Sequence, residues 1–143
     1  MWIDGKIYKS GGSRYWAAEV EDLDIYTQGK SQKDAMHMLK EAIELLAEAG
    51  GIKLDIEVKH PVRGDMERVV AGCSDTKAFI AFLLKRQRQK SGLSIRQVAE
   101  KIGARSKTAY ARYEQGRCEP SLSKLQVLLK AMNPVAKTVI HMA

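Results

Sequence analysis

No stretch of this 143-residue sequence approaches the ~20 apolar residues that are needed to cross a bilayer, and Asp4 stands close to the N-terminus with no apolar core around it. We therefore expect neither a membrane span nor a secretory signal. The sequence has only two cysteines, Cys73 and Cys118, and neither has a second Cys or His at the spacing of metal ligands. We expect free thiols in a reducing compartment, which with the missing signal predicts a cytoplasmic protein that does not contact membranes.

The sequence also lacks the motifs of common catalytic sites. It has no Gly-rich phosphate loop and no HExxH, and His37, His60 and His141 are scattered, with no Ser or Cys placed to form a triad. The acids of the first half show no spacing typical of a metal cluster: Asp4, Glu19, Glu21, Asp22, Asp24, Asp55 and Glu57. We expect no catalytic residue, no metal and no cofactor. The acids are interpreted as a solvated rim or as a surface that attracts a basic partner.

Charge is present in excess, and it is unevenly divided. Residues 1–60 hold eight Lys and Arg against eleven Asp and Glu, a net −3, whereas residues 61–143 hold sixteen against six, a net +10. This asymmetry predicts a polyanionic partner for the second half and a different partner for the first. Each half is short and buries only a small core, so we also expect a homodimer or tetramer.

Leu93–Gly116 reads as two short helices joined by a tight turn. Ser94 followed by Gln97 is a capping box that opens the first helix. Gly103 ends it, because glycine adopts the left-handed conformation after a helix without a steric penalty. Ser106 can cap the second helix, which is stopped by the final glycine of the segment.

The second helix has one apolar and one cationic face. Its buried face is expected to hold Tyr110 and Tyr113, and its exposed face carries cations, a hydroxyl and a small residue but no acid, which suits a helix that enters the major groove. Arg112 is placed to pair with guanine O6 and N7, and the first helix to meet phosphates. The candidate DNA-binding residues are Arg96, Gln97, Arg105, Ser106, Lys107, Thr108, Ala111, Arg112 and Arg117.

Lys85–Met132 resembles a helix-turn-helix domain of the Cro and phage-repressor type. Its run Thr108–Arg117, TAYARYEQGR, is similar to NAYARYEQGR, which is typical of one branch of the HicB antitoxins. The resemblance implies that the domain binds operator double-stranded DNA as a dimer. It also implies an ion pair between Glu114 and Arg88, because related repressors join this Glu to an Arg near the end of the domain's first helix.

The first half predicts an α+β layer in the order β-β-β-α-β. The expected elements are strands Trp2–Lys9, Arg14–Val20 and Leu23–Thr27, a helix from a Ser31 cap to Ala49, and a strand Ile52–Val58. Here a Thr-Gln-Gly turn leads into a Ser-capped helix that ends in Ala-Glu-Ala-Gly-Gly, and this resembles the HicB N-terminal domain. That domain has a truncated ribonuclease-H-like fold and binds the HicA toxin.

The expected domains are residues 1–60, a linker over 61–74 in which Glu67–Gly72 is a candidate short strand, and a helix-turn-helix domain over 75–143. In the last of these we expect a helix from an Asp75 cap to about Lys90, and a candidate strand over Val135–Met142. A closing helix over Ser121–Met132 is expected to turn its leucines inward, namely Leu122, Leu125, Leu128 and Leu129.

Taken together, the resemblance implies an antitoxin that neutralises a HicA-type mRNA-cleaving toxin and represses its own operon. The alternative is a stand-alone transcriptional regulator whose first domain senses a small ligand or mediates dimerisation. A third reading is a nucleic-acid-processing enzyme built on the ribonuclease-H-like half, whose metal-dependent cleavage would be lost on changing Asp22 or Asp24.

Overall fold

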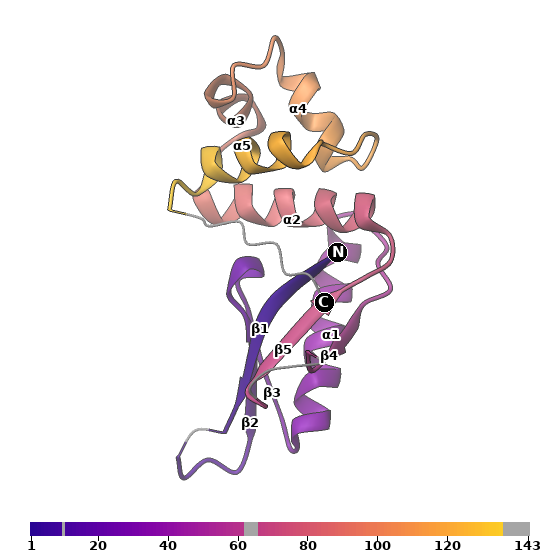
Figure 1. Cartoon of the computed structure of the whole chain (residues 1–143), viewed down its shortest axis with the longest axis vertical. Coiled ribbons are helices and arrows are strands. Elements are labelled where there is room, and N and C mark those ends of the chain that lie inside the picture. The colour runs from indigo at the N-terminus through magenta and orange to yellow at the C-terminus, as the bar shows by residue number, and fades with distance from the viewer. Residues whose placement is uncertain (10, 62–65, 136–143) are drawn as a thin grey trace. The chain divides into compact units, whose positions relative to one another are not determined.

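The computed structural model describes residues 1–9, 11–61 and 66–135, and the chain divides between Phe79 and Ile80 into two compact units. Figure 1 labels the elements of each unit. The first unit is an α+β layer, and the second is helical. The first contains β1 (Trp2–Tyr8), β2 (Trp16–Val20), β3 (Ile25–Gly29), α1 (Gln32–Ala49), β4 (Glu57–Lys59) and β5 (Arg68–Gly72). The helices that follow are α2 (Thr76–Ser91), α3 (Ile95–Lys101), α4 (Lys107–Glu114) and α5 (Leu122–Met132), with α2 running across the boundary.

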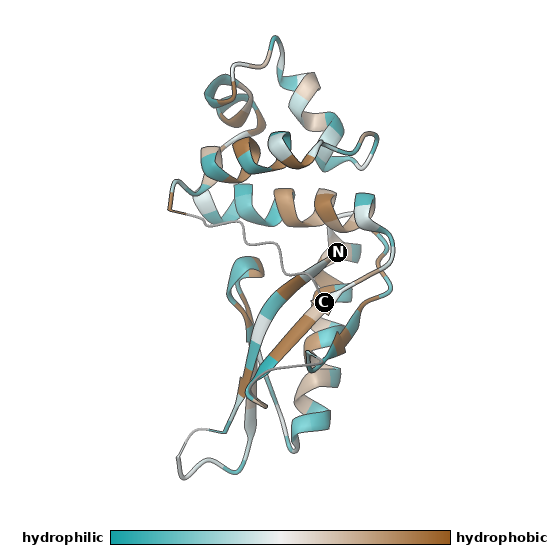
Figure 2. Cartoon of the chain, in the orientation of Figure 1, coloured by the Kyte–Doolittle hydropathy of each residue, from teal (hydrophilic) through white to brown (hydrophobic). Residues whose placement is uncertain are grey.

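The strands of the first unit form one antiparallel sheet in the order β3-β2-β1-β5-β4. Along β1 every second residue is buried, because successive side chains of a strand point to opposite faces. Ile3 and Ile7 face the core, and Asp4 and Lys6 face away from it, an alternation that Figure 2 shows as brown and teal segments. The result is a sheet with one apolar face.

Helix α1 covers that apolar face. The Ser31 hydroxyl accepts a hydrogen bond from the Asp34 amide at 3.1 Å, which is the predicted cap. Four residues at a spacing of four, Ala35, Leu39, Ile43 and Ala47, are fully buried along the side that meets the strands. Periodicity in the sequence therefore predicted the helix and the buried Ala35, Leu39 and Ile43. It was wrong in the second half of the helix, where Leu46 and Ala49 were expected inside but are exposed, and where Ala47 is buried instead.

The structure corrects three expectations for the first half. β3 begins at Ile25 and includes the residues that were expected to form a turn, Gln28 and Gly29. The strand expected over Ile52–Val58 is reduced to Glu57–Lys59. Leu54 and Ile56 are buried as their alternation predicts, but the Ile56 amide donates to the Glu44 carboxylate at 2.8 Å rather than to a neighbouring strand.

The largest correction concerns the segment expected to be a linker. Arg68–Gly72 forms β5, which pairs with β1 on one side and β4 on the other, so the candidate short strand is an inner strand of the sheet. The first unit therefore extends well beyond residue 60, and its described residues form a sheet of five strands, in which the candidate strand joins the four that were expected. The strand expected over Val135–Met142 lies, apart from Val135, outside the described residues.

The helices of the second unit begin and end where the sequence predicted. Asp75 caps α2 by accepting from the Ala78 amide at 2.9 Å, and Ser121 caps α5. Within α5, Leu125 and Leu128 are buried, but Leu122 is exposed in the first turn, which corrects its expected inward position. None of the helices in the described ranges is both long and apolar enough to cross a bilayer. Cys73 and Cys118 are free thiols, as expected.

Gly29 provides a test of how closely α1 approaches the sheet. A Cβ at this position would lie 2.3 Å from the Ala35 backbone nitrogen, so a side chain would force the first turn of α1 away from β3. We expect Gly29→Ala to lower the free energy of unfolding by about 1–3 kcal/mol, measured by urea denaturation. Gly11→Ala is the control, because its Cβ would meet nothing within 4 Å. Equal stability of the two variants would contradict the close approach.

Candidate nucleic-acid interface

Of the two short helices α3 and α4, the first is held by the side-chain cap that the sequence specifies. The Ser94 hydroxyl accepts from the Gln97 amide at 3.1 Å, and the Gln97 side chain accepts from the Ser94 amide at 2.8 Å, which completes the predicted capping box. Gly103 follows α3 with φ +65°, the left-handed conformation expected of it. Ser106 is the N-cap of α4, but its hydroxyl makes no capping hydrogen bond.

The structure leaves most of the candidate contact residues on the surface. Lys107, Thr108 and Arg112 of α4 are exposed, and Arg105 and Ser106 are exposed just before it. At the start of α3, Arg96 and Gln97 are exposed too, although Arg96 forms an ion pair with Glu100 at 3.3 Å. The carbonyl oxygen of the Gln97 side chain is occupied by the capping box, so its amide group is the part that remains for a phosphate.

The exposure expected for residues in and just after α4 needs correction at several positions. Ala111 is only half-exposed, so it is a weaker candidate contact than the sequence suggested. Tyr110 is fully buried as expected, whereas Tyr113 is half-exposed and is not a core residue. Ala109 and Gln115 are exposed and were missed by the sequence analysis. On a helical wheel both residues lie about 100° or more from the buried Tyr110, which is the signal that could have found them.

A buried ion pair joins the end of α2 to the end of α4. Arg88 donates from Nε to Glu114 Oε1 at 2.6 Å and from Nη2 to Oε2 at 3.0 Å, and its Nη1 donates to the Leu93 carbonyl oxygen at 3.1 Å. Glu114 is 7% exposed. The bidentate geometry fixes the direction of both side chains, and hence the orientation of α4 on α2. This pair was expected from the family resemblance.

Tyr110 adds a third member to this cluster. Its hydroxyl donates to Glu114 Oε1 at 2.5 Å and lies 3.6 Å from the Met132 sulfur. Burial, together with the hydrogen bond to the Glu114 carboxylate, raises the pKa of Tyr110 well above its usual value. The hydrogen bonds that Arg88 donates to the Glu114 carboxylate raise the pKa of Arg88 as well. Tyr110 is therefore held as a neutral donor beneath the exposed face of α4.

The surface around α4 is strongly cationic. Residues 80–133 contain twelve Lys and Arg against three acids, a net +9. Of the three acids, Glu114 is buried against Arg88 and Glu100 is paired with Arg96, so little negative charge opposes the cations of α4. Such a field attracts a polyanion and raises its rate of association.

Residues 80–133 match the family model of a helix-turn-helix domain. The second unit is a helix-turn-helix domain. Such a domain implies that the protein binds DNA, and the regulation of transcription is the usual role of that binding. A comparison with curated proteins found no match for the chain. The particular DNA contacts of the helix-turn-helix domain, Lys107 and Arg112 included, stay predictions.

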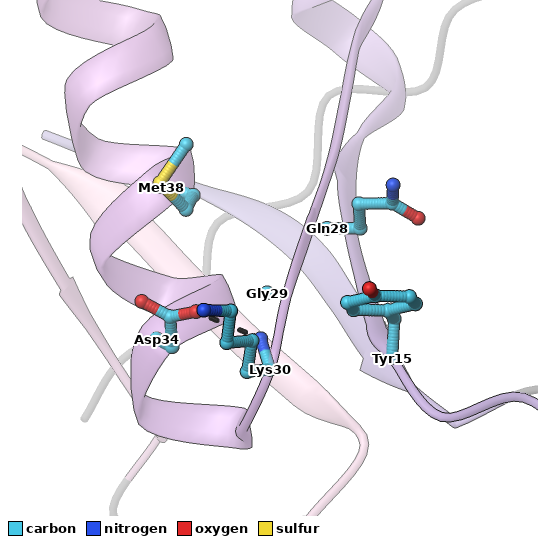
Figure 3. A pocket seen from close by; sticks show the side chains of 6 residues that line it. All are labelled: Tyr15, Gln28, Gly29, Lys30, Asp34 and Met38. Carbon is cyan, nitrogen blue, oxygen red and sulfur yellow. Dashed lines mark hydrogen bonds between the residues drawn. The ribbon is translucent and has the colours of Figure 1, made fainter.

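The first unit carries a shallow pocket of about 270 Å³ at the outer side of β3. Figure 3 shows Asp34 and Met38 of α1 on one side and Tyr15 and Gln28 on the other, with Gly29 and Lys30 between them. The Asp34 carboxylate accepts a hydrogen bond from the Lys30 amide at 2.7 Å. Within the described part of the chain, no group of three or more His, Cys, Asp or Glu is placed to hold a metal ion.

Removing Glu114 tests the role of the ion pair. Glu114→Ala leaves Arg88 and the Tyr110 hydroxyl without their acceptor, so we expect a loss of about 3 kcal/mol in the free energy of unfolding, together with loss of DNA binding. Urea denaturation and gel shifts measure the two effects. Glu119→Ala, which removes an exposed acid of the same domain, should change neither. A Glu114→Ala domain with unchanged stability but no DNA binding would contradict a positioning role.

The raised pKa of Tyr110 predicts a loss of stability at alkaline pH. The folded domain binds this proton more tightly than the unfolded chain does, so the contribution is fully present below about pH 10, the usual pKa of tyrosine, and is lost as pH rises toward the folded value. We expect wild type to be more stable than Tyr110→Phe by an amount that is constant from pH 8 to about 10 and shrinks above it. Denaturation of both proteins from pH 8 to 11 measures this difference, and parallel stability curves over that range would contradict the prediction.

Proposed function

We propose that this protein is an antitoxin of the HicB type. In this proposal the helix-turn-helix domain binds an operator and represses the protein's own operon, and the first unit binds and neutralises a HicA-type mRNA-cleaving toxin. The observation that carries the proposal is the joining of an acidic α+β unit to a basic helix-turn-helix domain. Residues 1–79 carry a net −3 and residues 80–133 a net +9, which favours two partners of different chemistry.

For operator binding, α4 is proposed to enter the major groove with its first turn leading. Lys107 and Thr108 then lie at bases or adjacent phosphates, and Arg112, a turn later, forms a bidentate pair with a guanine. Arg105, Arg117 and the start of α3 are proposed to contact the phosphate backbone. One such helix reads few base pairs, so we propose that a homodimer or tetramer places two of them on half-sites about one helical turn apart.

For toxin neutralisation, the first unit is proposed to act by binding alone, and we assign it no catalytic residue and no cofactor. The family resemblance supports this assignment through the Thr-Gln-Gly sequence and the Ser-capped helix that follows it. In the structure the Thr-Gln-Gly residues are the end of β3 rather than a turn, and the Ser-capped helix is α1. The net negative charge of the unit favours a basic partner, as an RNA-cleaving protein is expected to be.

The alternative is a stand-alone regulator whose first unit senses a small ligand, and the pocket between β3 and α1 favours it. At about 270 Å³ the pocket is at the lower end of the volumes typical of ligand sites. A gene for a small basic protein beside this one supports the antitoxin. Absence of such a gene, with a metabolite that raises the melting temperature of the chain, supports the sensor.

Separation of the two activities tests the proposal. Arg112→Ala should weaken binding to the upstream DNA by about five- to 150-fold, because a bidentate contact to guanine contributes about 1–3 kcal/mol. Lys107→Ala should weaken binding and flatten its dependence on salt. Both variants should still rescue growth when they are co-expressed with the toxin, since they lie outside the first unit.

Lys130→Ala is the matched control, because it removes an exposed cation of α5 and leaves α4 intact. If it weakens DNA binding as much as Arg112→Ala does, the effect is one of total charge and α4 does not read the bases. If wild type fails to rescue growth from the toxin encoded beside it, the antitoxin role is wrong even though the DNA results stand.

A further inference from the structure

Helix α1 has a second apolar stripe beside the one that packs on the sheet. Met38, Ala42, Leu45 and Ala49 stand at the spacing i, i+4, i+7 and i+11, which places them along one side of the helix. Leu45 is 65% exposed and Met38 38% exposed, whereas the core stripe of the same helix is fully buried. Leu46 lies between the two stripes and is also exposed. We call Met38, Ala42, Leu45 and Ala49 the outer stripe.

A row of acids runs along one side of the outer stripe. Asp34, Glu41 and Glu48 are spaced by seven residues, so they stand in line on consecutive double turns of α1. Glu41 and Glu48 are exposed, and Asp34 is half-exposed. Neighbouring side chains of the helix already contact some of its acids, since Lys40 pairs with Glu44 at 3.6 Å and His37 Nε2 lies 3.4 Å from Glu41 Oε1. The outer stripe is therefore an apolar surface that is bordered on one side by a row of acidic side chains.

The outer stripe ends at the pocket beside β3. Met38 belongs to both, and Asp34 joins the pocket to the acidic row (Figure 3). The pocket has an apolar wall from Tyr15 and Met38, which suits the stem of an arginine or lysine. Both the Asp34 carboxylate and the Lys30 cation line it, so the charged end of such a side chain would have to face Asp34. In the described sheet β3 is paired only with β2, so this surface also adjoins a strand edge.

We propose that the outer stripe, with its acidic row and the pocket, is the surface that docks a small basic protein. This inference rests on the proposed function, under which that protein is the toxin. Its apolar side chains would cover Leu45 and its neighbours, its cations would face Asp34, Glu41 and Glu48, and one Lys or Arg would enter the pocket. Anchoring residues surrounded by complementary charge are typical of protein–protein interfaces.

Charge is the reason for choosing this occupant. Nucleic acids and anionic lipids carry the same sign as the acidic row and are repelled by it. A second copy that packed its own outer stripe here would bring another acidic row to the same interface, which opposes association. A basic globular protein satisfies both the apolar stripe and its border.

Leu45→Glu in the full chain is the primary test, and calorimetry with a catalytically inactive form of the toxin encoded by the neighbouring gene gives the Kd. We expect Leu45→Glu to raise the Kd at least tenfold and to leave binding to the upstream DNA unchanged. Met66→Glu is the control, because Met66 is as exposed, at 64%, but lies outside α1. Glu41→Lys with Glu48→Lys should weaken binding more at low salt than at high salt.

The outcomes separate this inference from the function on which it rests. If wild type does not bind the toxin, or no such gene is present, both are overturned. If wild type binds and Leu45→Glu binds equally well, only the docking surface is wrong. If Leu45→Glu changes the molar mass of the chain alone, measured by light scattering, then a second copy occupies the outer stripe and the proposal is overturned.

Discussion

The Arg88–Glu114 ion pair is the contact on which presentation of α4 depends. It links the last turn of α2 to the last residue of α4, and Tyr110 binds the same carboxylate from within α4. A buried ion pair contributes little net stability, because desolvation of both charges offsets their attraction. Its value lies in direction, since a bidentate pair tolerates little rotation. The exposed cations of α4 therefore stand on a helix whose orientation is set from beneath.

Local sequence signals predicted the helices because their causes are local. The capping box at Ser94, the left-handed Gly103 and the cap at Ser31 each act within a few residues of chain, and each lies where it was expected. Strand pairing depends on residues far apart, and the sequence indicated a candidate strand at Glu67–Gly72 without its partners. Nothing near Arg68–Gly72 reveals that this segment pairs with the first residues of the chain, or that Glu44 takes the amide of Ile56.

In the candidate interface too, features with a local cause were predicted, and features that depend on distant neighbours were not. Periodicity placed Lys107 and Arg112 on the exposed side of α4, and the family resemblance supplied the partner of Glu114. Tyr113 and Leu122 were assigned to the core because they are apolar, yet burial depends on which neighbours reach them. In a unit this small, helix ends and edges outnumber enclosed positions, so apolar type alone overestimates the core.

The small size of the first unit also bears on the outer stripe of α1. A unit of 79 residues has few ways to bury a helix on two sides, and its sheet offers α1 only one apolar face. The outer stripe therefore exposes apolar area that costs free energy in water until something covers it. A partner that binds there only when α1 is folded on the sheet stabilises the unit by mass action. Docking at the outer stripe would thus tie the stability of the first unit to the concentration of its partner, whereas the ion pair that orients α4 lies wholly within the second unit.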